Sequence, residues 1–369
     1  MKNVVRFSTG FGLGRSWAGV GLALAAVSLN VSAAQAVERY SAFVMDAETN
    51  EVLHADQAED SRYPASLTKM MTLYMLFEAL ERKEISLTDK MTASRVASLQ
   101  APTKLGLKRG DQISVDTAIK ALVTKSANDV AVVIAEKLGG SEGRFAARMT
   151  ARARELGMTS TRFVNASGLP NVQQRTSAKD MAVLGRALIR DFPQYYSYFK
   201  TPGMTWRTRY ARNHNGLLGR VEGMDGIKTG YTRMSGFNLT SSVERNGHRI
   251  IAVVMGGTSA ATRDAQMAHL IEGAFEEIAR RTGQPLNSAT FVSLPINRVA
   301  VEFADRQSGQ TGEDGAPNES APASGIAVQP AAPDRPLYTA PAPTGGGIGS
   351  ITGGGAGLSL VAPYADPLY

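Results

Sequence analysis

Apolar and polar residues alternate along residues 37–300 in two distinct periods. Short apolar or alternating runs, which are typical of strands, occur at residues 40–45, 52–55, 226–231, 237–243 and 249–255. Apolar residues spaced three and four apart predict helices at residues 65–81, 115–138, 141–156, 177–190 and 262–281. Strands at both ends with helices between them predict an α+β fold, in which one antiparallel sheet is flanked by helices and carries a mostly helical lobe.

The first 36 residues have the pattern of an export signal. Three basic residues precede an apolar run at residues 17–31, and the small-residue site Ala34-Gln35-Ala36 follows. This order predicts a secretory signal that is cleaved before Val37, and hence an exported protein of the periplasm or cell envelope. The alternative is an uncleaved membrane anchor, for which the run is short against the roughly 20 residues of a membrane span.

The C-terminal part of the chain differs in composition from the rest. Residues 301–369 contain 9 of the 16 prolines and 12 of the 37 glycines, and such a segment buries too little apolar surface to offset the entropy of ordering it. We therefore predict that residues 305–369 form a Gly/Pro-rich disordered tail. Residues 287–304 are predicted to be a short β-like extension of the folded domain, which spans residues 37–286.

Composition narrows the chemistry that is open to the folded domain. The chain has no cysteine, which excludes a cysteine nucleophile and a zinc–thiolate site, and its four histidines form no HExxH pair. We therefore expect neither a metal nor a cofactor. The basic residues behind the net charge of +7 are scattered and not interleaved with aromatic residues, so nucleic acid is not an expected partner. Serine, threonine, lysine and carboxylate chemistry remain.

Ser66-Leu67-Thr68-Lys69 lies at the start of a predicted helix. The spacing places Ser66 and Lys69 on one helix face, about one turn apart. A serine hydroxyl becomes a strong nucleophile when a nearby base takes its proton, and a lysine can be that base when burial or a second ammonium disfavours its own charge. Alone, the motif more often marks a surface serine and lysine; Ser197-Tyr198-Phe199-Lys200 has the same spacing and no evident role.

Two more short motifs follow in the chain. Ser126 and Asn128 are spaced so that a hydroxyl and an amide can face one cleft from a turn between helices, although both residue types also favour helix caps. Lys228-Thr229-Gly230 lies on a predicted strand, where the lysine supplies positive charge, the threonine can bind a carboxylate and the glycine lets a substrate backbone approach. Alone, this last motif is more typical of an ordinary edge strand.

The three motifs in this order resemble the active-site set of penicillin-binding proteins and class A β-lactamases. In particular, the chain is similar to the serine-type D-Ala-D-Ala carboxypeptidases, which are low-molecular-mass penicillin-binding proteins with a β-lactamase/transpeptidase-like fold. The resemblance runs from about Tyr40 to Arg281. It includes Tyr63-Pro64-Ala65-Ser66-Leu67-Thr68-Lys69-Met70, Phe163-Val164-Asn165, Gly168-Leu169, Asp225-Gly226-Ile227-Lys228-Thr229-Gly230-Tyr231-Thr232 and Asn238-Leu239.

The resemblance implies that residues 37–286 are a peptidase domain acting on peptidoglycan stem peptides that end in D-Ala-D-Ala. Ser66 would attack the peptide carbonyl, Lys69 would take its proton, and Ser126 would help to protonate the departing D-alanine. The backbone N–H groups of Ser66 and Tyr231 would form the oxyanion hole, and β-lactams would be covalent inhibitors. The implied substrate-binding residues are Asn128, Lys228, Thr229, Gly230, Tyr231 and Arg263. For Arg263 the alternative is a solvated charge at the start of a helix.

The motifs leave other activities open. A D,D-endopeptidase that cuts peptidoglycan cross-links would carry the same three motifs, and a catalytically silent wall-binding protein could keep the fold. A β-lactamase is less expected, because no acidic residue can be assigned as its deacylating base. Many similar proteins carry a C-terminal amphipathic membrane anchor, whereas residues 358–369 here lack a basic face and contain two prolines. Membrane attachment therefore has little support.

Overall fold

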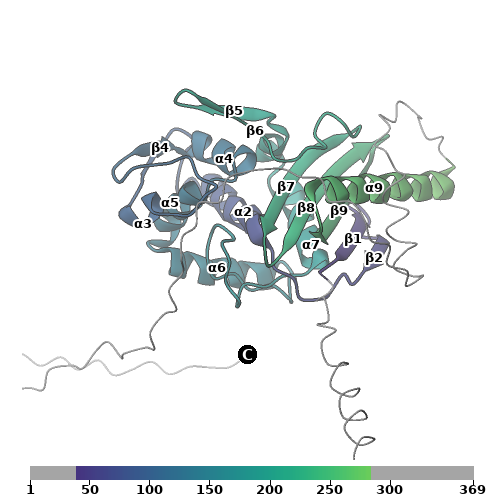
Figure 1. The fold of residues 1–369 in the computed structure, drawn as a ribbon. Coiled ribbons are helices and arrows are strands. Elements are labelled where there is room, and N and C mark those ends of the chain that lie inside the picture. The colour runs from purple at the N-terminus through teal and green to yellow at the C-terminus, as the bar shows by residue number, and fades with distance from the viewer. Residues whose placement is uncertain (1–38, 284–369) are drawn as a thin grey trace, which may run out of the picture. The chain divides into compact units, whose positions relative to one another are not determined.

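The central sheet has five antiparallel strands in the order β2-β1-β9-β8-β7, as Figure 1 shows. They are β1 (Ser41–Asp46), β2 (Val52–Asp56), β7 (Met224–Thr232), β8 (Gly236–Arg245) and β9 (His248–Gly257). Because β1 pairs with β9, strands from both ends of the domain lie side by side, and the predicted antiparallel sheet is confirmed. The computed structural model describes residues 39–283. The predicted signal segment, β-like extension and tail lie outside the described residues.

Helices cover both faces of this sheet (Figure 1). α9 (Ala260–Thr282) packs on one face, where its apolar residues meet Val254 of β9. α7 (Ala178–Asp191) packs on the other face, where it shares a core with Val253. Successive residues of a strand point to opposite faces, so a sheet covered on both sides needs strands that are apolar throughout. This explains the uninterrupted apolar run in β9.

The helices between β2 and β7 form the expected helical lobe. They are η1 (Ala65–Leu67), α2 (Thr68–Glu81), α3 (Arg95–Ser98), α4 (Val115–Thr124), α5 (Asn128–Gly139), α6 (Glu142–Glu155), α7, α8 (Pro193–Tyr196) and η2 (Ser197–Lys200). Two short strand pairs accompany them, β3 (Lys90–Thr92) with β4 (Gln112–Ser114) and β5 (Gly203–Trp206) with β6 (Arg209–Arg212). α2 is buried on nearly all sides, which is why its sequence is apolar almost throughout. None of the helices within residues 39–283 has the length and apolar character that a membrane crossing requires.

The predicted helix at residues 115–138 is wrong in its length. The chain forms two helices there, α4 and α5, because it turns at residues 125–127. Ser126 has a φ of 57°, in the left-handed region, through which a right-handed helix cannot continue. No glycine or proline marks the break, so the apolar periodicity alone predicted one continuous helix. The turn places Ser126 and Asn128 at the start of α5. This is the turn between helices from which their side chains were expected to face one cleft.

Candidate active site

Ser66 lies on the single helical turn η1, directly before α2. The side chain of Lys69, one turn later, points back along the same face, and its Nζ donates a hydrogen bond to Ser66 Oγ at 3.1 Å. The preceding residue Ala65 has a φ of 47°, which is uncommon for a residue other than glycine. The predicted pairing of Ser66 with Lys69 is therefore present, and the backbone that carries Ser66 is held in a strained conformation.

Lys69 is fully buried, with no exposed surface. Its Nζ also donates to Asn128 Oδ1 at 2.8 Å and to the backbone oxygen of Ser167. Burial lowers the pKa of Lys69 well below its usual value, and the positive charge of Lys228 lowers it further, against a smaller opposite effect of Asp129. A neutral lysine amine in contact with a serine hydroxyl can accept the hydroxyl proton.

The two residues of the second motif come together with Lys69 through the turn before α5. The backbone N–H of Asn128 donates to Thr103 O at 2.7 Å and its Nδ2 donates to Ala101 O at 2.9 Å, so the amide oxygen is fixed toward Lys69. Ser126 Oγ is buried and has no hydrogen-bond partner within the described residues. A buried hydroxyl without a partner is costly, and this one is free to bond a substrate or a transferred proton.

The third motif lies on β7, whose backbone approaches the Ser66 segment closely. A Cβ added at Gly230 would stand 3.0 Å from both Ser66 N and Pro64 O, so only glycine lets the strand pack here without displacement. Lys228 is 1% exposed and its Nζ donates to Thr229 O at 2.9 Å. Burial, together with the charge of Arg263, lowers the pKa of Lys228 to about 7.

Asn238 on β8 holds the segment before Ser66 against the sheet. Its Nδ2 donates to Tyr63 O at 3.0 Å and to Pro64 O at 3.2 Å, and its Oδ1 accepts from Gly256 N at 3.0 Å. The side chain is fully buried, and its amide connects this segment to β9. Asn238 belongs to a segment that resembles the family, but the local sequence does not predict this role.

A family model and several curated proteins are similar to this chain. A family model described as D-alanyl-D-alanine carboxypeptidase matches residues 28–259. The chain belongs to this family. The D-alanyl-D-alanine carboxypeptidase DacD of Salmonella typhimurium is 37% identical over 236 residues, which are 62% of this chain and 60% of the relative. The D-alanyl-D-alanine carboxypeptidase DacA of Escherichia coli is 34% identical over 268 residues, which are 70% of this chain and 66% of the relative.

Solved structures of penicillin-binding proteins share the fold. Penicillin binding protein 5 from Haemophilus influenzae has a TM-score of 0.62 at 33% identity, over 64% of this chain and 70% of that chain. Penicillin-Binding Protein D2 from Listeria monocytogenes, in a cefotaxime bound form, has a TM-score of 0.58 at 32% identity, over 64% of this chain and 96% of that chain. The chain spans about three fifths of the length of the first curated relative named.

Arg263, a predicted carboxylate-binding residue of this D-alanyl-D-alanine carboxypeptidase family member, is 4% exposed and is no solvated charge. Its Nη1 donates to Asn238 O at 2.9 Å, and its Nε donates to Asp264 Oδ1 at 2.7 Å. It therefore lies beside β8, and its positive charge helps to lower the pKa of Lys228. Its second Nη group has no partner among the described residues, and a role in binding a substrate carboxylate stays a prediction.

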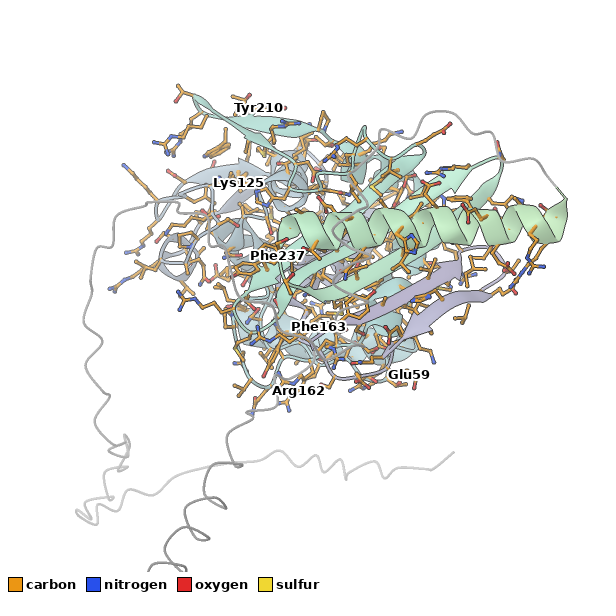
Figure 2. All side chains as sticks on the ribbon, turned by 45° about the vertical axis from the view of Figure 1, so that its right-hand side comes forward. Glu59, Lys125, Arg162, Phe163, Tyr210 and Phe237 are labelled. Carbon is orange, nitrogen blue, oxygen red and sulfur yellow. The ribbon has the colours of Figure 1, made fainter. Side chains whose placement is uncertain are left out.

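Thr229 and Tyr231 flank Gly230 on β7 and differ in exposure. Thr229 is 8% exposed, whereas Tyr231 is 53% exposed and stacks on Phe237 of β8 with 4.2 Å between ring centroids. Phe237 is labelled in Figure 2. The structure brings Ser66, Lys69 and Asn128 into direct contact. Within residues 39–283, no group of three or more His, Cys, Asp or Glu side chains is placed to hold a metal ion.

Sequence reasoning missed several residues that support the site. Gly168 has a φ of +86°, and a Cβ there would lie 1.8 Å from Ala65 O. Ser167 supplies a backbone acceptor to Lys69, and Asp129 accepts backbone N–H groups from Leu105 and Gly106. Gly168 belongs to a segment that resembles the family, but no local periodicity connects residues 167–168 with Ser66, which is about one hundred positions earlier in the chain.

Proposed function

We propose that the protein is a serine D,D-carboxypeptidase that removes the terminal D-alanine from peptidoglycan stem peptides. The observation that carries this proposal is the contact between the fully buried amine of Lys69 and the hydroxyl of Ser66. A buried lysine beside a serine is costly for a protein that only binds the cell wall, because desolvation disfavours its charge. A catalytic role explains why the buried lysine is retained, so we prefer the carboxypeptidase to a catalytically silent wall-binding protein.

The chemistry proceeds through an acyl-enzyme. Ser66 Oγ attacks the carbonyl between the two D-alanines while Lys69 Nζ takes the hydroxyl proton. The backbone N–H groups of Ser66 and Tyr231 donate to the oxyanion of the tetrahedral intermediate; loss of one such donor typically costs about 100- to 1,000-fold in rate. The C–N bond then breaks, and the leaving amine takes a proton that Ser126 helps to deliver. Water hydrolyses the ester and regenerates Ser66.

Substrate binding rests on the positive charge and the free strand edge of β7. Lys228 and Arg263 form a buried pair of cations, and we propose that they attract the terminal carboxylate of the stem peptide, with Thr229 as a hydrogen-bond partner. β7 is the last strand of the sheet. A substrate backbone can pair along it beside Gly230, while the Asn128 amide holds a substrate carbonyl.

The same site suits covalent capture of β-lactams, whose strained amide would acylate Ser66. The Listeria monocytogenes relative is named as a penicillin-binding protein in a cefotaxime bound form, which supports this extension. A D,D-endopeptidase that cuts cross-links is the second candidate, since it would use the same residues. The signal-like pattern of the first 36 residues supports action in the periplasm or cell envelope.

A fluorescent penicillin tests the acyl-enzyme directly. The purified wild-type protein should become covalently labelled at Ser66, as peptide mass spectrometry would locate, and Ser66→Ala should not be labelled. Ser197→Ala is the matched control, because Ser197 begins a second Ser-x-x-Lys sequence, on η2; it should label as the wild type does. A wild-type protein that fails to label would refute the proposal.

The release of D-alanine separates the two peptidase activities. Monomeric muropeptides that end in D-Ala-D-Ala should lose one D-alanine per molecule, and purified cross-linked dimers should remain dimeric. Cleavage of dimers at a higher rate than trimming of monomers would show that the protein is an endopeptidase.

A further inference from the structure

The loop of residues 165–168 lies against the amine that is proposed as the general base. Ser167 O accepts a hydrogen bond from Lys69 Nζ, and the loop is closed to solvent there, since Ala166 is 0% exposed and Ser167 is 1% exposed. A lysine amine stands on a flexible four-carbon stem, so its acceptors decide where it points. The position of Ser167 O therefore helps to set the direction in which Lys69 faces Ser66.

Two side chains from other elements hold this loop by the backbone of Ala166. Thr72 of α2, which comes three residues after Lys69, donates from Oγ1 to Ala166 O at 2.7 Å. Glu142, the first residue of α6, accepts from Ala166 N at 3.0 Å through Oε1. A buried backbone N–H or C=O without a partner is costly, so these two bonds both satisfy the loop and fix its place.

The Glu142 carboxylate has no cation beside it. Among the described residues it forms no ion pair, and the hydrogen bond that it accepts comes from Ala166 N. Burial raises the pKa of Glu142, the bond from Ala166 N opposes this in part, and the charge of Glu136 on α5 adds a smaller upward effect. A partly buried carboxylate without a counter-ion is costly, so a role other than ion pairing has to account for it.

The position of Glu142 at the start of α6 also suits a purely structural role. An acidic residue in the first turn of a helix is favoured by the helix dipole, and Ser141 already caps α6 by accepting from Arg144 N at 3.3 Å. The dipole interaction needs only a negative charge, whereas the bond to Ala166 needs an acceptor atom at one place. Glutamine keeps the acceptor and removes the charge, so the two roles can be separated.

We propose that Glu142 is a positioning residue for acylation, which holds the 165–168 loop so that Ser167 O directs Lys69 Nζ toward the serine hydroxyl. This inference rests on the proposed function, because it depends on Lys69 acting as the base. Two residues of backbone join the N–H that Glu142 holds to the carbonyl that accepts from Lys69. A shift of the loop at Glu142 is therefore passed on to the amine.

Stopped-flow acylation by a β-lactam, measured across a range of pH, tests the proposal. Glu142→Ala removes the acceptor and should slow acylation about threefold to tenfold where Lys69 is neutral, the factor that one hydrogen bond contributes. Its acidic limb should move to lower pH by about 0.5–1, because a less well placed Ser167 O stabilises the ammonium form of Lys69 less. Glu142→Gln keeps the acceptor and should match the wild type in both rate and limb.

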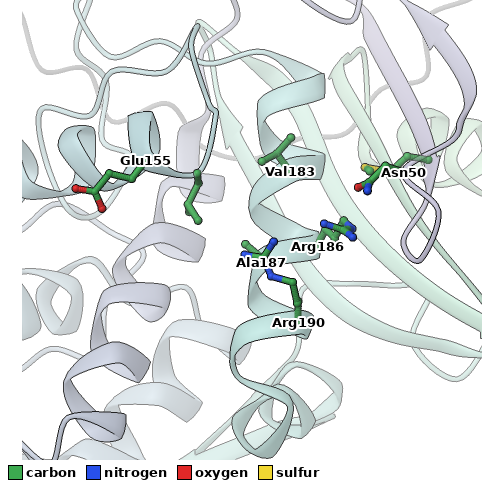
Figure 3. Close-up of a pocket in the computed structure, with 8 residues that line it drawn as sticks. Asn50, Glu155, Val183, Arg186, Ala187 and Arg190 are labelled. Carbon is green, nitrogen blue, oxygen red and sulfur yellow. The ribbon is translucent and has the colours of Figure 1, made fainter.

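Glu155→Ala is the matched control on the same helix. Glu155 lies at the other end of α6, where it is bonded to Arg152 and lines a separate cavity of about 270 Å³ (Figure 3). Its replacement removes a carboxylate from the same helix and should leave the rate and the limb unchanged. Lys228 and Asp129, whose charges act on the pKa of Lys69, are kept in every variant.

Thr72→Val acts on the same loop from the side of α2. It removes the hydrogen bond to Ala166 O, so it should slow acylation and move the acidic limb in the same direction as Glu142→Ala does. The amount of protein that fluorescent penicillin labels after a long incubation should equal that of the wild type in every variant. This endpoint reports that each variant folds, and urea titration measures how much stability each has lost.

Two results would overturn the role of Glu142. One is a wild-type rate and an unmoved limb in both Glu142→Ala and Thr72→Val. The other is a limb that moves as far in Glu142→Gln as in Glu142→Ala, which would assign the effect to charge alone. A wild-type protein that fails to label would overturn the proposed function and this inference with it, whereas normal labelling with unaltered variants would count against Glu142 alone.

Discussion

Replacing Gly168 by alanine should disable the nucleophile from a position outside the three motifs. The new Cβ would lie 1.8 Å from Ala65 O and 2.9 Å from Ser66 N, and relief of the clash requires the first separation to reach at least 3.0 Å. The atoms that must yield are backbone, so Ser66 moves with them by about 1 Å. A misplacement of about 1 Å at a reacting group costs on the order of 100-fold in rate. We expect acylation by a β-lactam to fall by at least this factor.

Gly157→Ala is a matched control for this change. Gly157 has the same φ of +86° as Gly168, but a Cβ there meets nothing within 4 Å. Its substitution should cost only the left-handed strain, about 1–2 kcal/mol in the free energy of unfolding, and should leave acylation unchanged. Gly168→Ala should cost a further 1–3 kcal/mol or so for overpacking.

Urea unfolding would measure the stability of each variant. Stopped-flow penicillin acylation would measure the acylation rate, without urea and at a temperature where both variants are folded. Near-equal acylation rates for Gly168→Ala and Gly157→Ala would refute the reasoning, because they would show that the Ala65–Ser66 backbone is not fixed by residue 168. A loss of rate in both would assign the effect to backbone strain in general.

Three further predictions concern the groups around Ser66. Lys69→Arg should abolish acylation, since arginine keeps its proton, and near-normal acylation in that variant would exclude Lys69 as the base. Acylation by a β-lactam should decline as the pH falls, because Lys69 becomes protonated. In Lys228→Gln this acidic limb of the pH–rate profile should move to higher pH, because the repulsion that lowers the pKa of Lys69 is removed. An unmoved limb would contradict the coupling of the two lysines. Asn238→Ala should lower the free energy of unfolding by about 2–4 kcal/mol, from three lost hydrogen bonds at roughly 1 kcal/mol each plus unpaired backbone groups, as urea titration would test.

The parts of the fold that were predictable have a clear period or a local signal. α9 carries apolar residues at helical spacing, β9 is marked by a continuous apolar run, and the spacing of Ser66 and Lys69 fits one turn of helix. Short elements gave no such signal. The pair β5 and β6 has four residues in each strand and few buried ones, so no period can show.

The supporting residues of the site were hidden for a different reason. Asn238 acts on Tyr63 and Pro64 across about 175 positions of sequence, and Ser167 reaches Lys69 across 98. Each is one polar residue inside an apolar or loop segment, and its partners depend on which strands become neighbours. Only the tertiary fold decides that, so local pattern could supply the reacting groups but not the groups that orient them.

The chemistry of Lys69 depends on how opposing influences on its charge compare. Three acceptors surround its Nζ, and Asp129 is near, all of which favour the ammonium. Complete burial opposes them and is the largest influence on the pKa of Lys69, which it lowers. The carboxylate of Asp129 already accepts hydrogen bonds from the N–H groups of residues 105–107 at 2.8–3.0 Å. These bonds stabilise its negative charge, so Asp129 is a weaker counter-ion for Lys69.

Lys228 then decides the balance, because it adds a second buried amine without adding a carboxylate. Two ammonium groups in one dry site repel each other strongly, so the two amines favour a state in which at least one is neutral. The pKa of each amine is lowered; Lys69 touches Ser66, whereas Lys228 lies on β7 beside the proposed carboxylate site. A state with Lys69 neutral and Lys228 charged therefore places the base at the nucleophile and the cation where an anion would bind.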